Sequence, residues 1–181
     1  MKKQCMDNYS THLPMLVAAV MRARKPVIEL GMGEYSTPIL RELCRSLGVE
    51  LLSVETSAEW FQRFAGQQNE FHRMVLVRDW SELHTLIPAR PLVPWGVAFV
   101  DNGDTGRDWR SRGRNLGCLA NSADYLVAHD TEDGQDTYGY NSVGGTFKSA
   151  YTDDARTPWT TVFSNFHACD FGPGLKKYVH V

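Results

Sequence analysis

VIELGMGEYSTPIL, residues 27–40, is the stretch that decides the fold. An apolar run leads into two closely spaced glycines, Gly31 and Gly33, and then into small hydroxyl residues, a proline and a second apolar stretch. The apolar run is typical of a buried strand, and Pro38 suits the first turn of a helix. The stretch predicts a strand, a sharp turn that lets the backbone approach a ligand, and a helix whose free N–H groups face the same crevice.

The same alternation of apolar runs and helical patterns extends along the chain in both directions, which is typical of a parallel α/β sheet. The strands are expected at residues 26–31, 49–55, 72–79, 95–104, 123–133, 145–152 and 159–166, and the helices at 13–24, 37–48, 57–66, 81–87, 106–120 and 138–147. Ser10 or Thr11 is expected to cap the first helix. The last two strands flank a polar turn and predict an antiparallel hairpin. We therefore expect a Rossmann-like, doubly wound, mostly parallel seven-stranded sheet with helices on both faces. It would form one domain over residues 1–181, with an N-terminal helical segment at 1–25.

The composition of the 181 residues is that of an ordinary globular protein, with 43% hydrophobic and 22% charged residues and a net charge of −2. The sequence has no excess of basic residues that would indicate a nucleic-acid partner. No apolar stretch approaches the roughly 20 residues that span a membrane. The four cysteines, Cys5, Cys44, Cys118 and Cys169, lie far apart and are expected to be reduced thiols. These features predict a cytoplasmic protein that acts on a small molecule. They do not specify an oligomeric state.

Two acidic residues mark the crevice at the carboxyl ends of the first two strands, where doubly wound sheets bind ligands. Glu29 precedes Gly31 and suits a cationic ligand group, although a tight turn without a ligand would explain the glycines equally well. Glu55 lies about 20 residues beyond Gly33, where an acid can accept the hydroxyls of a ribose. The alternative for Glu55 is an exposed acid at a strand end.

A dinucleotide site is the obvious rival interpretation. Such a site uses a third glycine, but here the pattern continues into Ser36, and Glu29 would repel a pyrophosphate. A nucleoside with a positively charged amino-acid tail fits better, and S-adenosylmethionine is such a molecule.

ELGMGEYST resembles the first motif of the class I S-adenosylmethionine-dependent methyltransferases, and VETSAEW resembles their ribose-binding motif. VRDW corresponds to the segment that holds the adenine, and FVDNGD is similar to the fourth motif. Tyr35 replaces the third glycine of the commoner form, and the resemblance extends over roughly residues 10–170. It implies a methyltransferase of class EC 2.1.1.- whose cofactor, S-adenosylmethionine, is bound by Glu29, Gly31, Gly33, Ser36, Thr37, Glu55, Asp79, Trp80 and Asp101.

Asp101 and Asp130 end two strands that are expected to be parallel neighbours, so their carboxylates should meet at the rim of the crevice. They could hold Mg²⁺ and, through it, a substrate diol. That arrangement is similar to the catechol O-methyltransferases and to the cephalosporin hydroxylase-like branch. In the simpler alternative, Asp101 contacts the methionine end or a turn amide and Asp130 caps a helix. His129 is the candidate general base, or else a histidine at the rim of the core. Asp101, His129 and Asp130 are thus the expected catalytic residues.

Other polar and aromatic residues have a structural and a functional interpretation. Arg107, Arg110 and Arg114 recur at helical spacing and could clamp an anionic group or form a solvated face. Tyr138, Tyr140 and Trp159 could line an acceptor pocket or pack against the sheet. The remaining histidines, His12, His72, His84, His167 and His180, are expected to be structural.

The sequence thus favours an S-adenosylmethionine-dependent methyltransferase with a small-molecule acceptor, with O-methylation as one option. A module that binds the cofactor but catalyses nothing is the second hypothesis. An NAD-dependent oxidoreductase is the third.

Overall fold

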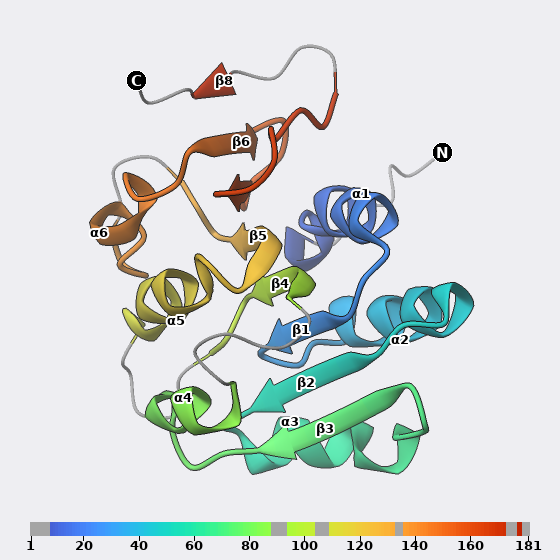
Figure 1. Ribbon diagram of the computed structural model, residues 1–181. Helices are drawn as coiled ribbons and strands as arrows, with labels where there is room; N and C mark the ends of the chain where they lie inside the picture. Colours follow the sequence, from blue (N-terminus) through green and yellow to red (C-terminus); the bar gives the residue numbers. More distant parts are fainter. Residues whose placement is uncertain (1–7, 88–93, 104–108, 133–135, 173–176, 179–181) are drawn as a thin grey trace, which may run out of the picture.

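The strands form one sheet with the order β3-β2-β1-β4-β5-β7-β6-β8 in the computed structural model, which describes residues 8–87, 94–103, 109–132, 136–172 and 177–178 (Figure 1). The strands are β1 Val27–Leu30, β2 Leu51–Glu55, β3 His72–Leu76, β4 Trp95–Val100, β5 Ala123–His129, β6 Ser149–Asp153, β7 Thr160–Ser164 and β8 Lys177–Tyr178. The helices are α1 Leu13–Ala23, α2 Ser36–Leu47, α3 Ala58–Phe64, α4 Leu83–Leu86, α5 Ser111–Leu119 and α6 Asn141–Gly144, with 3₁₀ turns η1 Asn8–Ser10, η2 Ala65–Gln67 and η3 Trp80–Glu82.

The sheet has the predicted mixed topology. Strands β1 to β5 are parallel to one another, and β7 inserts antiparallel between β5 and β6. The predicted fold class and terminal hairpin are confirmed. The short β8, which pairs antiparallel with β6, adds a strand that the sequence did not indicate. Strand β1 pairs with β2 on one side and with β4 on the other, so the direction of winding reverses there and the crevice opens beyond the ends of these strands.

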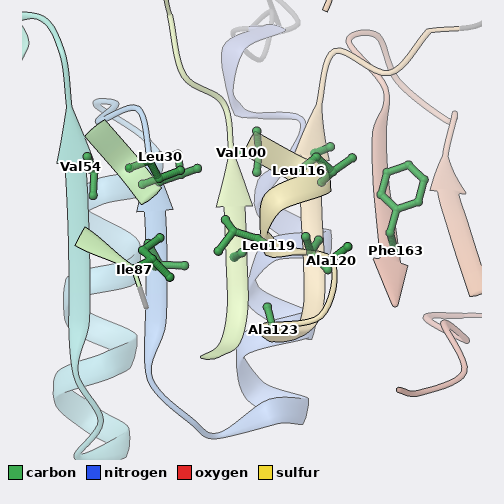
Figure 2. Close-up of a cluster of buried hydrophobic side chains, with 14 of the residues drawn as sticks. Leu30, Val54, Ile87, Val100, Leu116, Leu119, Ala120, Ala123 and Phe163 are labelled. Atoms are coloured by element: carbon green, nitrogen blue, oxygen red, sulfur yellow. The ribbon is translucent and has the colours of Figure 1, made fainter. Parts of the chain in front are cut away.

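Helices cover both faces of the sheet, and the alternation of side chains along β1 decides what each face receives. Ile28 and Leu30 join a buried cluster with α4 and α5, in which Figure 2 shows Leu30 between Val54 and Val100. Val27 belongs to the opposite cluster with α1 and α2. Glu29, in phase with Val27, therefore points toward the face covered by α1 and α2.

Several helices differ from their predicted bounds for local reasons. The segment expected at 106–120 is helical only from Ser111 to Leu119, and Arg107 lies outside the described residues. The segment expected at 138–147 is a single turn, Asn141–Gly144, where adjacent glycines weaken a helix. Helix α1 begins after His12 without a side-chain cap. The Thr11 hydroxyl, one of the expected caps, instead donates to the carbonyl of Pro158 at 2.7 Å.

Among the described residues, no helix is long and apolar enough to cross a membrane.

Gly31 directly follows β1 and packs against Asp101 and Asn102, which follow β4. Its φ is +88°, and a Cβ at this position would lie 2.5 Å from the Cα of Asn102 and 2.6 Å from the carbonyl oxygen of Asp101. Only a residue without a side chain fits both the backbone conformation and the space. The first glycine of the motif is therefore required by the packing of the sheet edge as well as by any ligand.

We predict that Gly31→Ala destabilises the protein more than Gly48→Ala. Gly48 ends α2 with φ +67° but faces open space, so alanine there adds only the left-handed strain of about 1–2 kcal/mol. Gly31→Ala adds overpacking, which costs about 1–3 kcal/mol more. Urea unfolding of both variants measures the difference. Equal losses in the free energy of unfolding would mean that the contact with Asn102 carries no cost.

Candidate active site

A cavity of about 940 Å³ opens at the carboxyl ends of β1, β2, β4 and β5. One half of its wall comes from the turn after β1 and from the end of β2. The other half comes from the ends of β4 and β5, the start of α5 and the residues before α1. Its lining residues include the predicted Gly31, Gly33, Ser36, Glu55, Asp101, His129 and Asp130. The structure thus gathers seven of the eleven predicted site residues around one cavity.

Glu55 lines this cavity, and its carboxylate also accepts hydrogen bonds from the loops that follow β1 and β2. Its Oε1 accepts the backbone N–H groups of Thr56 at 2.7 Å and Ser57 at 2.8 Å. Its Oε2 accepts only one N–H among the described residues, that of Met32 at 2.8 Å. Since a carboxylate oxygen has two lone pairs, Oε2 retains one acceptor site for a ligand hydroxyl.

Glu29 does not line the cavity, contrary to our expectation of a direct ligand contact. Its side chain is fully buried beneath the start of α2. The carboxylate accepts hydroxyl hydrogens from Ser36 at 2.7 Å and Ser53 at 2.5 Å, and Thr37 lies 3.0 Å away. Burial raises the pKa of Glu29 to about 7, although the hydroxyl donors pull it down. Glu29 and Thr37 therefore stabilise the turn between β1 and α2 from the side that faces away from the cavity.

Asp79 and Trp80 also lie away from the cavity lining. The Asp79 carboxylate caps the η3 turn by accepting the Ser81 N–H at 2.8 Å. Trp80 is buried in the core and donates its indole N–H to the carbonyl of Gly103 at 3.1 Å. Their contact with an adenine stays a prediction, and neither side chain is part of the cavity wall. On that side of the cavity the lining residues are Met32, Thr56, Ser57, Trp60 and Arg63.

Arg112, which sequence reasoning passed over, organises the other half of the cavity. Its buried guanidinium lies 3.1 Å from Asp101 and 2.6 Å from Asp130, and its Nε donates to the carbonyl of Asn102 at 2.8 Å. It also stacks 4.1 Å from the centre of the Tyr138 ring. Helical spacing in the sequence separates Arg112 from its neighbours. It lies two residues from both Arg110 and Arg114, and therefore on the opposite side of the helix.

Asp101 pairs with His129 as well as with Arg112. The His129 Nδ1 lies 3.4 Å from the Asp101 carboxylate, and its Nε2 lies 3.0 Å from the Thr11 hydroxyl. Burial alone would raise the pKa of Asp101, but Arg112 and His129 outweigh it and hold the pKa low. Burial alone would lower the pKa of His129, but Asp101 outweighs it and the pKa is raised.

His12, which we expected to be structural, lines the cavity beside this pair. Its ring is 2% exposed and meets the His129 ring edge-on, with centroids 4.7 Å apart. Burial lowers the pKa of His12 to about 4, so the ring is neutral near pH 7. No periodic signal marks His12, because it precedes α1 and reaches the site only when α1 packs against β4 and β5 (Figure 1).

The aromatic and arginine candidates divide between the cavity and the core. Tyr138 lines the cavity together with Trp109, with ring centroids 6.1 Å apart. Tyr140 is buried and donates its hydroxyl to the carbonyl of His129 at 2.9 Å. Trp159 is not part of the lining, and neither are Arg110 and Arg114.

The arrangement suits a ligand that meets hydrogen-bonding groups at one end and a reactive cluster at the other. The carboxylate–imidazole pair of Asp101 and His129 can take a proton from a hydroxyl, and Trp109 and Tyr138 offer apolar walls. Asp130 is engaged by Arg112, so the expected magnesium pair of Asp101 and Asp130 is not what the side chains form. The acids and histidines that converge are His12, Asp101 and His129.

No protein-family model and no curated protein matches the sequence. Solved structures do match in fold. A candidate O-methyltransferase from Klebsiella pneumoniae superposes with a TM-score of 0.61 at 14% identity, over 92% of this chain and 84% of that one. A candidate caffeoyl-CoA O-methyltransferase from Staphylococcus aureus gives 0.58 at 9% identity, over 84% and 82% of the two chains. Cofactor-bound Rv0187 from MTB gives 0.56 at 16% identity, over 91% and 84%.

The buried Glu29 predicts a pH-dependent stability. Its folded pKa of about 7 exceeds the ordinary 4.5, so the folded state holds the proton more tightly between these values. The free energy of unfolding should therefore fall as the pH rises through this window. Relative to the wild type, Glu29→Gln should gain on the order of 3 kcal/mol between pH 4 and pH 8. Urea unfolding across the pH range measures this.

Glu42→Gln is the matched control for Glu29→Gln. A hydrogen bond and the charge of Arg45 lower the pKa of the exposed Glu42, so its removal should shift the difference in the opposite direction. A Glu29→Gln difference that does not change with pH would show that the buried carboxyl keeps its ordinary pKa.

Proposed function

Because this chain has the fold of the class I S-adenosylmethionine-dependent methyltransferases, we propose that it transfers a methyl group from S-adenosylmethionine to a small-molecule acceptor. One observation carries the proposal: the glycine turn and Glu55 line the same cavity as the cluster of Asp101, His129 and Arg112. The cofactor would lie along the first half and the acceptor in the second. Two expectations stay predictions: that residues 1–181 form one domain, and that the protein is cytoplasmic.

The residues of the first half fit the cofactor. Glu55 keeps an acceptor site on Oε2 for a ribose hydroxyl, and Trp60 and Met32 offer apolar surface for a base. At Gly33, a Cβ would come within 3.2 Å of the Ser36 hydroxyl, so a side chain there would narrow the turn. Bound S-adenosylmethionine would supply a methyl group on a positively charged sulfur, ready for displacement.

Glu29 would act on the cofactor only through the turn that it supports. Its carboxylate fixes Ser36 and Thr37 at the start of α2, and the N–H of Gly33 lies 3.0 Å from the Thr37 hydroxyl. The turn is thereby held in place before any ligand binds, which lowers the entropy lost on binding.

The second half is where the acceptor would be held and activated. Displacement at the methyl carbon requires the nucleophile in line with the sulfonium, so positioning dominates the chemistry. Trp109 and Tyr138 would hold an apolar part of the acceptor, while Asp101 and His129 face its nucleophilic atom. Asp130 would act less directly, because Arg112 ties it to Asp101. Oxygen is the acceptor atom that suits these polar groups.

We predict that Glu55→Ala weakens binding of S-adenosylhomocysteine at least tenfold. A charge-assisted hydrogen bond is worth about 1.5–3 kcal/mol, and each 1.4 kcal/mol is a factor of ten. Calorimetric titration of S-adenosylhomocysteine measures the affinity. Glu50→Ala is the control, because Glu50 is exposed at the opposite end of β2 and should leave the affinity unchanged.

Unchanged affinity in Glu55→Ala would remove Glu55 from the cofactor site. Thermal unfolding of the same variant separates a lost ligand contact from a collapsed loop, since Glu55 also accepts the N–H groups of Met32, Thr56 and Ser57.

Two rival functions give different results in simple measurements. A silent binding module would bind S-adenosylhomocysteine but methylate none of a panel of small hydroxyl-containing acceptors. An NAD-dependent oxidoreductase would be stabilised against heat by NAD and not by S-adenosylhomocysteine, because a ligand that binds only the native state raises its stability.

A further inference from the structure

Three potential metal ligands converge at the inner end of the cavity from segments far apart in the sequence. His12 precedes α1, Asp101 follows β4, and His129 ends β5. One ligand atom from each lies within 4.8 Å of those of the other two. We propose that His12, Asp101 and His129 bind a divalent first-row transition-metal ion such as Zn²⁺.

The spacing between His129 and Asp101 fits a shared ion. Their Nδ1 and carboxylate oxygen are 3.4 Å apart, which is longer than an ordinary N–H···O hydrogen bond of about 2.7–3.2 Å. Two ligands bound to one tetrahedral ion at about 2.1 Å lie about 3.4 Å from each other. The pair is therefore spaced as two ligands of one ion are.

The hydrogen bonds of Thr11 orient His129 for this role. The single hydrogen of the Thr11 hydroxyl goes to the Pro158 carbonyl at 2.7 Å, so its oxygen accepts from the His129 Nε2–H at 3.0 Å. In the neutral ring, the lone pair is then on Nδ1, which faces Asp101. Metal-binding histidines are held in the same way, by a hydrogen bond from their second ring nitrogen.

His12 provides an independent observation in favour of a bound ion. Its ring is 2% exposed, yet neither of its nitrogens has a hydrogen-bond partner among the described residues. An unsatisfied buried polar group costs about 1–3 kcal/mol. A bond from one nitrogen to a metal ion would remove that cost for that nitrogen.

The local charge favours an added cation. Arg112 contacts both Asp101 and Asp130, so one positive charge faces two negative ones in a poorly solvated site. Arg112 lies beside one oxygen of Asp101, Oδ1, and the other, Oδ2, faces His129. A metal ion between Oδ2 and the imidazole would supply the missing positive charge.

The donor set selects the kind of ion. Mg²⁺ and Ca²⁺ prefer oxygen ligands alone, whereas two imidazoles and a carboxylate suit Zn²⁺ and its first-row neighbours. Three protein ligands would leave a coordination position open toward the cavity. If the proposed methyl transfer is correct, that position would hold the acceptor oxygen and lower its pKa. Metal binding itself does not depend on the proposed function.

The test is a titration of the metal-free full chain. Co²⁺, whose visible absorption reports tetrahedral nitrogen and oxygen ligands, and Zn²⁺, followed by calorimetry, should each bind one ion per chain. His12→Ala and Asp101→Asn should each weaken binding by more than about 10–100-fold, because that is the loss caused by mutating a residue that only supports a metal ligand. His167→Ala, which removes a half-exposed histidine beside Asp124, should bind as the wild type does.

The possible outcomes separate the metal site from simpler explanations. Absence of a tetrahedral Co²⁺ spectrum, or unchanged affinity in His12→Ala, would overturn the site. Loss of binding in His167→Ala alone would show adventitious surface binding only. Asp101→Asn preserves side-chain size, and circular dichroism establishes that each variant is folded. S-adenosylhomocysteine titrated into the same samples tests the proposed function separately.

Discussion

The buried carboxylate of Glu29 is the interaction on which the turn between β1 and α2 depends. Strand β1 supplies the carboxylate, β2 supplies Ser53, and α2 supplies Ser36 and Thr37. Placing a carboxylate inside a protein is unfavourable unless its lone pairs are satisfied, and these hydroxyls satisfy them. The same bonds set the first turn of α2 against the strand ends. The glycine turn between β1 and α2 therefore has little freedom to move.

Arg112 has the corresponding role at the ends of β4 and β5. Its guanidinium contacts both carboxylates that directly follow β4 and β5, and its stacking on Tyr138 extends the contact to the cavity wall. A buried cation between two acids leaves one negative charge unmatched. That excess explains both why His129 holds a proton readily and why a metal ion could take its place.

The sequence predicts the sheet well, because the strands follow from local patterns, and it identifies Gly31, Gly33, Ser36 and Glu55 among the residues that line the cavity. Apolar runs specify the strands, and Gly31 and Glu55 stand at fixed distances from strand ends. At the ends of β4 and β5 it identifies Asp101, His129 and Asp130 but not their neighbours His12 and Arg112. His12 joins the site only through tertiary packing, and Arg112 resembles its exposed neighbours until the helix is oriented. Glu29 and Trp80 follow the motif, but strand alternation and core packing turn their side chains away from the cavity. Such orientations depend on neighbours that no short motif contains.

The position of His12 has a consequence for how this protein can change over time. Helix α1 packs through Ala19 and Val20 into the cluster that contains Phe99 and Tyr125. A slip of α1 by one residue would move the imidazole about 1.5 Å, well beyond the tolerance of about 0.2 Å in a metal–ligand bond. A substitution of the buried Ala19 that displaces α1 would then disturb the proposed metal site as well as the core.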